Sequence, residues 1–289
     1  MTLRSTWTDF VARDSPGITG TLTFVAMLAF AGNSILCRLA LRTTSIDPAT
    51  FTTVRIATAA LALWLVSPSD RPRESGSGLS AIALFIYAAA FSFAYVELPT
   101  GLGALLLFGA VQFTMFGWGF WRGERLTALQ AVGVLTALVG VVVLLLANTP
   151  LEPFSMASAG LMLTAGAAWG VYSLRGRGVA NPLSATRANF LLAVPLAAAL
   201  SAAFLPGRAD TVGIALAAAS GAVTSGAGYA IWYLVVPRVA AVQAASVQLC
   251  VPAVAALFGY VLMGETMTPT QWISAAAVLG GVAVTLRKM

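Results

Sequence analysis

The sequence contains no histidine, a single lysine and only two cysteines. Charged residues make up 9% of the chain, whereas soluble domains have about 25%. Catalysis inside a membrane requires a base, a nucleophile or metal ligands, and the serines and threonines deep in the apolar segments have no histidine, aspartate or lysine beside them. We therefore expect no catalytic residue, no metal site and no cofactor. Cys37 and Cys250 both lie in apolar segments, which indicates small buried residues and not a disulfide.

Long apolar runs, in contrast, are abundant, and hydrophobic residues account for 59% of the sequence. A helix needs roughly 17–25 predominantly apolar residues to cross a membrane. Runs of this length or nearly so, uncharged except at Arg55, cover residues 15–37, 48–66, 79–96, 98–121, 126–151, 153–174, 188–207, 211–237, 239–264 and 266–286. We predict an all-α membrane protein with ten transmembrane helices. The first run has no small-residue cleavage site after it, so we expect a retained helix and not a signal peptide.

Two stretches of the chain, 141 residues apart, repeat one pattern. Eight identities across 21 positions pair Gly123-Glu124, Thr127, Gln130, Leu138, Gly140, Val141 and Val143 with Gly264-Glu265, Thr268, Gln271, Leu279, Gly281, Val282 and Val284. Composition bias would repeat alanine, valine or leucine but hardly this polar pattern, so we infer an internal duplication. The copies precede the fifth and the tenth predicted helix, which makes the repeated unit five helices long.

Because the repeated unit has an odd number of helices, the second copy begins on the opposite side of the membrane and has the inverted orientation. We predict two inverted five-helix repeats, residues 1–152 and 153–289, in one integral membrane unit. Twelve basic residues fall on the side of both termini and four on the other side, a bias that predicts cytoplasmic termini. We expect Glu124 and Glu265 to cap or orient the hairpins that contain them. We expect Arg55 and Arg187, which open the second and seventh predicted helices, to extend toward the membrane surface.

Several motifs of the second repeat form a recognisable set: Gly228-Tyr229-Ala230-Ile231-Trp232, Val239-Ala240-Ala241, Ala244-Ala245-Ser246, Pro252, Gly264-Glu265 and Gly280-Gly281. The first repeat matches more loosely through Gly32-Asn33, Arg55, Tyr95, Gly103-Ala104 and Gly123-Glu124. These motifs resemble the EamA-type drug/metabolite transporter superfamily, and the chain is similar in character to the YddG-like amino-acid exporters. The resemblance covers the chain beyond residue 15 and implies a ten-helix inverted-repeat carrier that exports small metabolites. The first repeat departs from the pattern, because Val111 stands where the second repeat has Pro252, which argues against a symmetric kink.

Inverted-repeat carriers bind substrate near the bilayer midplane, at the interface between the repeats. The candidates are therefore polar and aromatic residues that lie deep in the predicted helices. Among these, Tyr87, Phe91 and Tyr95 recur every four residues and so share one helix face. The predicted substrate-binding residues are Asn33, Tyr87, Phe91, Tyr95, Phe108, Gln112, Trp169, Tyr172, Tyr229, Trp232, Gln243 and Gln248. An uncharged cavity of aromatic and amide groups suits an aromatic or neutral amino acid, whose apolar side chain can stack on the rings.

Some of these residues also have a purely structural interpretation. Tyrosine and tryptophan near helix ends commonly form the interfacial aromatic belt, the interpretation we favour for Trp64, Trp121, Trp272 and Tyr95. For Asn33, Gln112 and Gln248, a role in hydrogen-bonded contacts between helices explains the presence of an amide equally well.

The carboxylates bear on the transport mechanism. Proton-coupled carriers usually place a titratable residue in the pathway, and here Glu97, Glu124 and Glu265 lie only at helix ends. Facilitated diffusion by alternating access is our first expectation, and proton antiport through Glu97 or another group at a helix end is the second.

The function we predict is export of amino acids or similar small metabolites. A multidrug or nucleotide-sugar-like carrier is the alternative among transporters, and a passive channel is the alternative from another class. Fifteen arginines against one lysine are typical of a GC-rich bacterial genome, so we expect the bacterial inner membrane as the location. The expected partners are a small-molecule substrate and the lipid bilayer, with no nucleic acid, and a monomer is compatible with the sequence.

Overall fold

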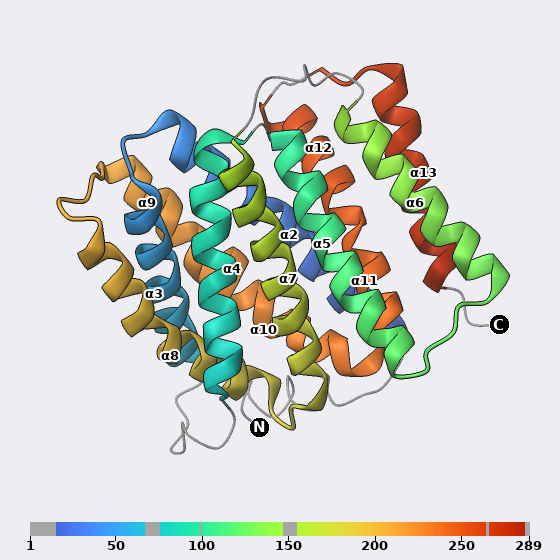
Figure 1. Ribbon diagram of the computed structural model, residues 1–289, viewed down its shortest axis with the longest axis horizontal. Helices are drawn as coiled ribbons and strands as arrows, with labels where there is room; N and C mark the ends of the chain where they lie inside the picture. The colour runs from blue at the N-terminus through green and yellow to red at the C-terminus, as the bar shows by residue number, and fades with distance from the viewer. Residues whose placement is uncertain (1–15, 67–75, 99, 147–154, 264–265, 287–289) are drawn as a thin grey trace, which may run out of the picture.

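The structure, a computed structural model, describes residues 16–66, 76–98, 100–146, 155–263 and 266–286 as a bundle of helices (Figure 1). The uninterrupted long helices are α2 (Pro16–Thr43), α3 (Pro48–Val66), α4 (Gly78–Glu97), α5 (Thr100–Trp121), α6 (Ala128–Leu146), α7 (Met156–Arg175), α8 (Pro182–Ala203) and α13 (Pro269–Leu286). The eighth crossing is composite, with α9 (Thr211–Ala219), the π-helical segment η2 (Ser220–Ala227), α10 (Gly228–Val235) and the short η3 (Val236–Arg238). The ninth crossing consists of α11 (Ala241–Gln248) and α12 (Cys250–Met263).

These crossings confirm the prediction of ten transmembrane helices. Nine of the helices in the described part of the chain are both long and apolar enough to span a membrane. The remaining one, α7, has the length of a span with 20 residues, but glycine, serine, tryptophan and tyrosine lower its hydropathy. Because α7 packs against both α4 and α5, its more polar residues lie inside the bundle.

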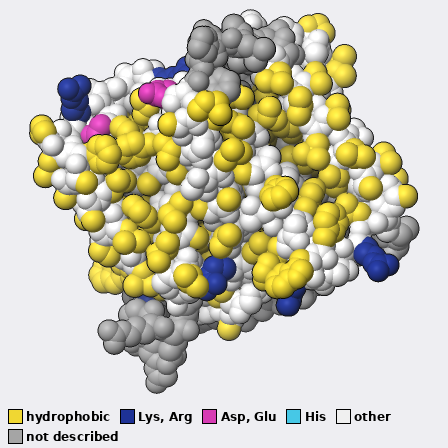
Figure 2. All heavy atoms as spheres, in the orientation of Figure 1, with side chains coloured by type: hydrophobic (Ala, Val, Ile, Leu, Met, Phe, Trp, Pro, Cys, Tyr) yellow, Lys and Arg dark blue, Asp and Glu magenta, His cyan; other side chains and the backbone are white. Residues whose placement is uncertain are grey.

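The surface of the bundle is apolar where a bilayer would cover it. Large hydrophobic side chains are exposed along the outer helices, for example Phe113, Leu135 and Ile273. In the face drawn in Figure 2, hydrophobic side chains cover the middle and the arginines and carboxylates lie toward the upper and lower edges. This distribution is typical of a protein whose solvent is hydrocarbon in the middle and water at both ends.

Contacts between helices follow the predicted two-fold relationship of the halves. The pair α4–α7 has its counterpart in α10–α2, and α5–α7 has its counterpart in α12–α2. Likewise, α3 packs on η2 as α8 packs on α4. In the pairs α3–α8 and α6–α13, the pseudo-two-fold exchanges the two helices, so each pair is its own counterpart. The contact pattern is consistent with two inverted five-helix repeats. The boundary that we place after residue 152 lies outside the described residues and stays a prediction.

The repeated sequence pattern forms the same helix cap in both halves. Gln130 Oε1 accepts from the Thr127 N–H at 3.1 Å, and Thr127 Oγ1 accepts from the Gln130 N–H at 3.2 Å. At the start of α13 the corresponding distances between Thr268 and Gln271 are 2.9 and 3.3 Å. These are reciprocal capping boxes, which satisfy backbone N–H groups that a helix start leaves unpaired. The polar part of the duplicated pattern therefore has a local structural cause.

Glycines bring α6 and α13 into close contact. A Cβ atom added at Gly281 would lie 2.5 Å from the Gly133 carbonyl oxygen, and one added at Gly140 would lie 3.1 Å from the Ser274 carbonyl oxygen. Gly140 and Gly281 are equivalent in the two repeats, and so are Gly133 and Ser274, which makes the two approaches related by the pseudo-two-fold. Lipid provides no hydrophobic drive between helices, so close packing of small residues holds this pair together.

The two halves differ in the helices that line the centre. The ninth crossing is interrupted at Leu249, shortly before Pro252, whereas α5 continues past Val111. The eighth crossing contains the π-helical η2, whereas its counterpart α4 is regular. The departure at Val111 therefore corresponds to a real asymmetry in structure. Both irregular segments belong to the second half.

Candidate central substrate site

Trp169 of α7 lies at the centre of an aromatic cluster in the interior of the bundle. Its ring centroid is 4.9 Å from that of Tyr87 (α4), 5.1 Å from Phe30 (α2), 4.6 Å from Tyr229 (α10) and 5.6 Å from Tyr172 (α7). All five side chains are buried. The cluster joins helices of both halves, as expected for a site at the repeat interface.

A small cavity of about 30 Å³ lies against this cluster. It is lined by Phe30, Asn33, Ser34, Tyr87, Phe91, Leu107, Phe108, Trp169, Gln248 and Val251. Ligand pockets are typically about 300–1,000 Å³, and a water needs roughly 10–15 Å³, so the space admits only water in this conformation. The structure brings six of the predicted site residues to one cavity, which is too small for a substrate and so is closed to one in this conformation.

Two amide side chains of this lining are fixed by hydrogen bonds. The Trp169 indole N–H donates to Gln248 Oε1 at 2.6 Å, and Gln248 Nε2 donates to the Ala244 carbonyl at 2.9 Å. Asn33 Oδ1 accepts from the Ser220 hydroxyl of η2 at 2.8 Å. Each amide therefore both lines the cavity and connects two helices, so the two interpretations given for them are compatible.

The remaining predicted residues lie outside the cavity lining. Tyr95 is buried, so it is not part of an interfacial belt, and packs on Phe91 with ring centroids 4.7 Å apart. Tyr172, Tyr229 and Trp232 form a second layer behind the cavity, where the Trp232 indole donates to the Ser173 hydroxyl at 2.9 Å.

Two of the predicted glutamines have structural partners. Gln112 Nε2 donates to the Ala245 carbonyl at 2.8 Å, which joins α5 to α11. Gln243 accepts from the Ala240 N–H at 3.2 Å and caps α11 at the end of the bundle. The structure does not bring Gln243 to the central cavity.

Arg55 was expected to extend to the membrane surface, and this expectation is wrong. The helix begins at Pro48, seven residues earlier, which places Arg55 about 10 Å along the helix axis from its start. The side chain is 1% exposed and lies in the interior. Arg187 of α8 is likewise buried, at 2% exposure. Both arginines lie within their helices and not at the ends.

The guanidinium of Arg55 contacts three hydroxyl groups behind the cavity. Its Nε donates to Ser225 Oγ at 2.8 Å, and its Nη2 donates to the Tyr229 hydroxyl and, at 3.5 Å, to the Tyr87 hydroxyl. Ser225 belongs to η2, whose Gly221 packs directly on the Arg55 backbone, where an added Cβ would meet the carbonyl oxygen. The π-helical segment thus presents hydroxyl groups to both Asn33 and Arg55, and such segments occur frequently at functional sites.

Sequence reasoning missed Phe30 and Arg55. Phe30 precedes Asn33 by three residues and so shares its helix face, a signal that could have identified it. Arg55 is the one charged residue within the second predicted run, and an ionisable residue inside a membrane helix indicates a functional site. Ser220 and Ser225 carried no signal, because their orientation depends on the π-helical turn.

A second, larger cavity of about 720 Å³ lies one helical turn from the first. Met27, Val247 and Val254 form its inner part, while Phe30 and Val251 of the same helices line the central cavity. Its outer part is formed at the ends of several crossings, by Thr19, Gly20, Thr23, Pro237, Arg238, Gln243 and Leu286. This cavity therefore widens toward the end of the bundle at which α2 begins and α13 ends.

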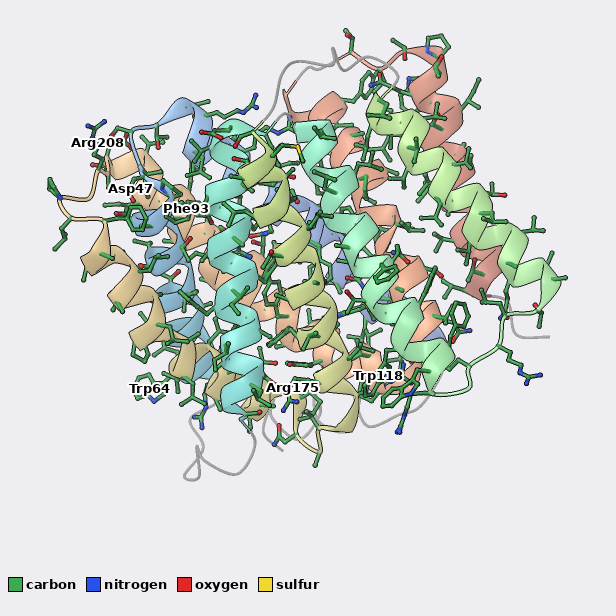
Figure 3. The ribbon with its side chains drawn as sticks, viewed as in Figure 1. Asp47, Trp64, Phe93, Trp118, Arg175 and Arg208 are labelled. Carbon is green, nitrogen blue, oxygen red and sulfur yellow. The ribbon has the colours of Figure 1, made fainter. Side chains whose placement is uncertain are left out.

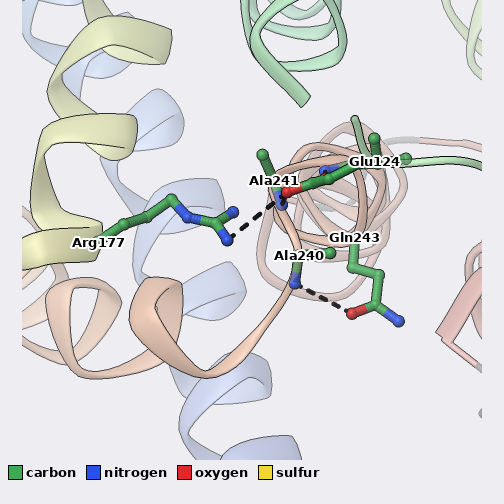
Figure 4. Close-up of polar contacts among 6 residues, drawn as sticks. Glu124, Arg177, Ala240, Ala241 and Gln243 are labelled. Atoms are coloured by element: carbon green, nitrogen blue, oxygen red, sulfur yellow. Dashed lines mark hydrogen bonds and ion pairs between the residues drawn. The ribbon is translucent and has the colours of Figure 1, made fainter. Parts of the chain in front are cut away.

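At that same end, Glu124 joins the two halves (Figure 4). Its carboxylate accepts from the backbone N–H groups of Ala241 and Val242, at 2.9 and 3.0 Å, and lies 3.6 Å from Arg177. Glu124 therefore caps α11 and not its own hairpin, which corrects our expectation. Its repeat counterpart Glu265 lies outside the described residues.

A different set of contacts joins the halves at the opposite end of the bundle. In Figure 3, Asp47 and Arg208 lie at this end, whereas Trp64, Arg175 and Trp118 lie at the other end. The Asp47 carboxylate accepts from the Arg208 N–H at 2.7 Å, and Asp210 Oδ2 accepts from the Ser45 N–H at 2.8 Å. Burial would raise the pKa of Asp47, but hydrogen bonds from Thr50, Arg208 and Ala49 lower it below its usual value. Hydrogen bonds from Ser45 and Gly213 lower the pKa of Asp210 in the same way.

The remaining carboxylate at a helix end, Glu97, belongs to the last turn of α4. Its Oε2 accepts from the Ser158 hydroxyl of α7 at 2.7 Å, and its side chain is exposed. Trp64, Trp121 and Trp272 are also exposed, with fractions of 52%, 75% and 42%, as the belt interpretation predicts.

Comparisons with known proteins agree with this architecture. A protein of Pseudomonas aeruginosa described as uncharacterized is 50% identical over 269 residues, or 92% of this chain and 93% of that protein. A Salmonella typhimurium protein named "Probable amino-acid metabolite efflux pump" is 25% identical over 232 residues, 74% of this chain and 78% of its own. A Streptantibioticus cattleyicolor protein named "Probable terminal-alkyne amino-acid exporter" is 25% identical over 251 residues, 84% and 83% of the two chains.

The fold and the family model lead to the same conclusion. A solved crystal structure with 18% identity has the same fold, with a TM-score of 0.77 over 94% of this chain and 98% of its own. The model of the EamA-like transporter family matches residues 156–287, the second repeat. With ten crossings, a duplicated five-helix unit and these relatives, the chain belongs to the EamA-like transporter family and is a multi-pass membrane transporter.

Proposed function

We propose that this transporter exports amino acids or similar small metabolites, with aromatic or neutral amino acids as its substrates. The observation that carries this proposal is the central cavity, which helices of both halves line with aromatic rings and amides. Aromatic rings would contact an apolar side chain, and the Asn33 and Gln248 amides would hydrogen-bond a polar backbone. The names of the two distant relatives, an amino-acid metabolite efflux pump and an amino-acid exporter, support the same substrate class.

Alternating access would open this closed cavity to one side at a time. The contacts between the halves at the two ends are suited to act as gates: Glu124 with α11 and Arg177 at one end, and Asp47 with the Arg208 backbone at the other. Each gate consists of a few hydrogen bonds between short loops, which a rocking motion of one repeat against the other can break. We further propose that the termini, and with them the larger cavity, face the cytoplasm of a bacterial inner membrane.

The charge of the cavity supports downhill transport. None of the described residues that line the central cavity is an aspartate, a glutamate or a histidine, the groups that usually bind a proton in a coupled cycle. This composition supports facilitated diffusion, driven by the outward gradient of the substrate.

Uptake by proteoliposomes tests the proposal. Labelled phenylalanine, leucine, glutamate and lysine, a nucleotide sugar and a lipophilic cation would be compared, each with and without an imposed pH gradient. We expect uptake of phenylalanine and leucine with little response to the pH gradient. Transport of the nucleotide sugar or of the cation alone would assign one of the alternative carriers, and strict dependence on the pH gradient would contradict facilitated diffusion and direct attention to Glu97.

A further inference from the structure

Arg55 is a charged group in the interior that has no charged partner among the residues the structure describes. No carboxylate among the described residues forms an ion pair with it, and its three hydrogen-bond partners, Ser225, Tyr87 and Tyr229, are neutral hydroxyl groups. Its Nη1 is buried and has no hydrogen-bond partner in the part of the chain that the structure describes. Arg55 thus has both an uncompensated charge and an unused donor.

Such a residue is costly in a membrane protein. Removing a charge from water without a counter-charge is strongly unfavourable, and arginine cannot lose its proton at any accessible pH. A role limited to holding the Tyr87 and Tyr229 hydroxyls would not require a charge, because the two N–H groups of a neutral amide can donate to two hydroxyl groups. Ionisable residues at membrane depth mark binding sites and pathways by default.

The position of the guanidinium indicates which site it serves. Its carbon atom Cζ lies 5.4 Å from the ring centroid of Tyr87 and 5.9 Å from that of Phe91, and both rings line the central cavity. The guanidinium therefore lies one side chain behind the cavity wall. No charged side chain lines the cavity itself among the described residues, and Arg55 is the charged group in contact with two of its lining rings.

We propose that Arg55 is the anion-binding residue of the central site and that substrates must carry a free carboxylate. When the cluster opens, the carboxylate would replace the long Arg55–Tyr87 contact and use the free Nη1, in the two-donor geometry that guanidinium offers to carboxylates. The apolar part of the substrate then lies against Trp169 and Phe91. This inference rests on the proposed function and adds to it the group that every substrate shares.

Competition on the wild-type protein is the first test. Unlabelled phenylalanine, 3-phenylpropionate, which lacks the amine, and phenylalaninamide, which lacks the carboxylate, would compete with labelled phenylalanine in proteoliposomes. The amide cannot form a charge-assisted hydrogen bond with Arg55. From the free energy of such a bond, we expect phenylalaninamide to compete roughly tenfold to a hundredfold more weakly than 3-phenylpropionate. Equal competition by the amide and the acid would overturn the proposal.

Variants then locate the anion-binding group. Arg55→Gln should abolish the preference for the acid over the amide, whereas Arg55→Lys should retain part of it. The matched control is Arg42→Gln, an exposed arginine at the end of α2 that donates to the Leu98 carbonyl, and it should keep the full preference. If Arg55 had only a structural role, its substitution would weaken competition by the acid and by the amide equally. An unchanged ratio of the two competition strengths in Arg55→Gln would therefore contradict the inference.

The test separates this inference from the proposed function. If phenylalanine and its amide are transported equally well, amino-acid export stands and the anion site fails. If no amino acid is transported, the thermal unfolding of the purified protein is compared in 3-phenylpropionate and in 3-phenylpropionamide. Stabilisation by the acid alone, lost in Arg55→Gln, would support the anion site without the proposed substrate, and equal effects of the two compounds would overturn it.

Discussion

Trp169 joins rings of three other helices in the central cluster, because it contacts Phe30 of α2, Tyr87 of α4 and Tyr229 of α10. We expect Trp169→Ala and Tyr87→Ala each to raise the apparent Michaelis constant for phenylalanine roughly tenfold. Aromatic pairs contribute about 0.5–1.5 kcal/mol beyond area burial, and about 1.4 kcal/mol corresponds to one decade. Initial rates of uptake against substrate concentration measure this change.

The control for this prediction is Trp272→Ala. Trp272 is 42% exposed and contacts Tyr260 at the outside of the bundle, so its removal should leave the Michaelis constant unchanged. Loss of a buried tryptophan can cost about 3–5 kcal/mol of stability, so Trp169→Phe, which keeps a ring, is measured in parallel. Unchanged affinity in folded Trp169→Ala and Tyr87→Ala proteins would mean that substrate binds elsewhere.

Asp47 has a pH-dependent role at the end of the bundle. Its Oδ1 accepts from the Ala49 and Thr50 N–H groups at 2.9 Å and caps α3, so Asp47→Ala should cost about 1 kcal/mol. Its folded pKa lies below the unfolded value of about 3.9, so the contribution is fully present above pH 4 and is lost as the pH falls through the folded pKa. Thermal unfolding from pH 7 to pH 3 should show the difference between variant and wild type shrinking in acid.

The matched variant at this gate is Arg208→Ala. Arg208 contributes its backbone N–H to Asp47, and the substitution keeps that donor, so stability should change little at either pH. A difference between Asp47→Ala and wild type that stays constant down to pH 3 would show that the carboxylate charge contributes nothing.

Which site residues can be predicted from sequence depends on the type of side chain. Asn33, Tyr87, Phe91, Phe108, Trp169 and Gln248 were identifiable because polar and aromatic groups deep in apolar helices are few. Arg55 was misplaced because an apolar run marks the length of a helix more clearly than its start, and here the start at Pro48 buries the arginine. The closing of the cavity could not be predicted, since it depends on the relative position of the two halves.

At the scale of helices, the α6–α13 pair provides a test within two adjacent residues. Gly281 faces the Gly133 carbonyl, whereas a Cβ added at Gly280 would meet nothing within 4 Å. Gly281→Ala should therefore destabilise the protein by roughly 1–3 kcal/mol, the usual cost of overpacking. Gly280→Ala should be neutral or stabilise by up to about 1 kcal/mol, because alanine is the better helix former.

Thermal unfolding of the two alanine variants in the same detergent measures this difference. Because the substitution is identical and the sites are neighbours, helix propensity cancels and the contact with α6 remains. Equal stability of both variants would show that the close approach of α6 and α13 contributes nothing.

Helices with local signals could be predicted from sequence, and those with non-local causes could not. The pattern Thr-x-x-Gln encodes its own cap, so the starts of α6 and α13 follow from four residues. The π-helical turn of η2 instead accommodates contacts with Asn33 and Arg55, which lie some 170 to 190 residues away in sequence. The interruption at Leu249 had a partial signal in Pro252, which the first repeat lacks.

At the scale of the whole molecule, inversion of the repeats has a direct consequence for topology. The loop between α2 and α3 and the loop between α7 and α8 are equivalent in the two repeats and should lie on opposite faces of the membrane. Single cysteines at Thr43 and Ala180, both exposed, in a background lacking Cys37 and Cys250 should react with an impermeant thiol reagent from opposite faces. Reaction of both from the same face would exclude an inverted repeat.

The central claim, that this chain is an alternating-access carrier of amino acids, is tested most directly by trans-stimulation. Uptake of labelled phenylalanine is measured into proteoliposomes that are either empty or preloaded with unlabelled phenylalanine, over a range of external concentrations. A carrier whose loaded cavity reorients predicts saturable uptake that preloading accelerates several-fold. Uptake that rises linearly with concentration and is indifferent to preloading would contradict the account and indicate a passive channel.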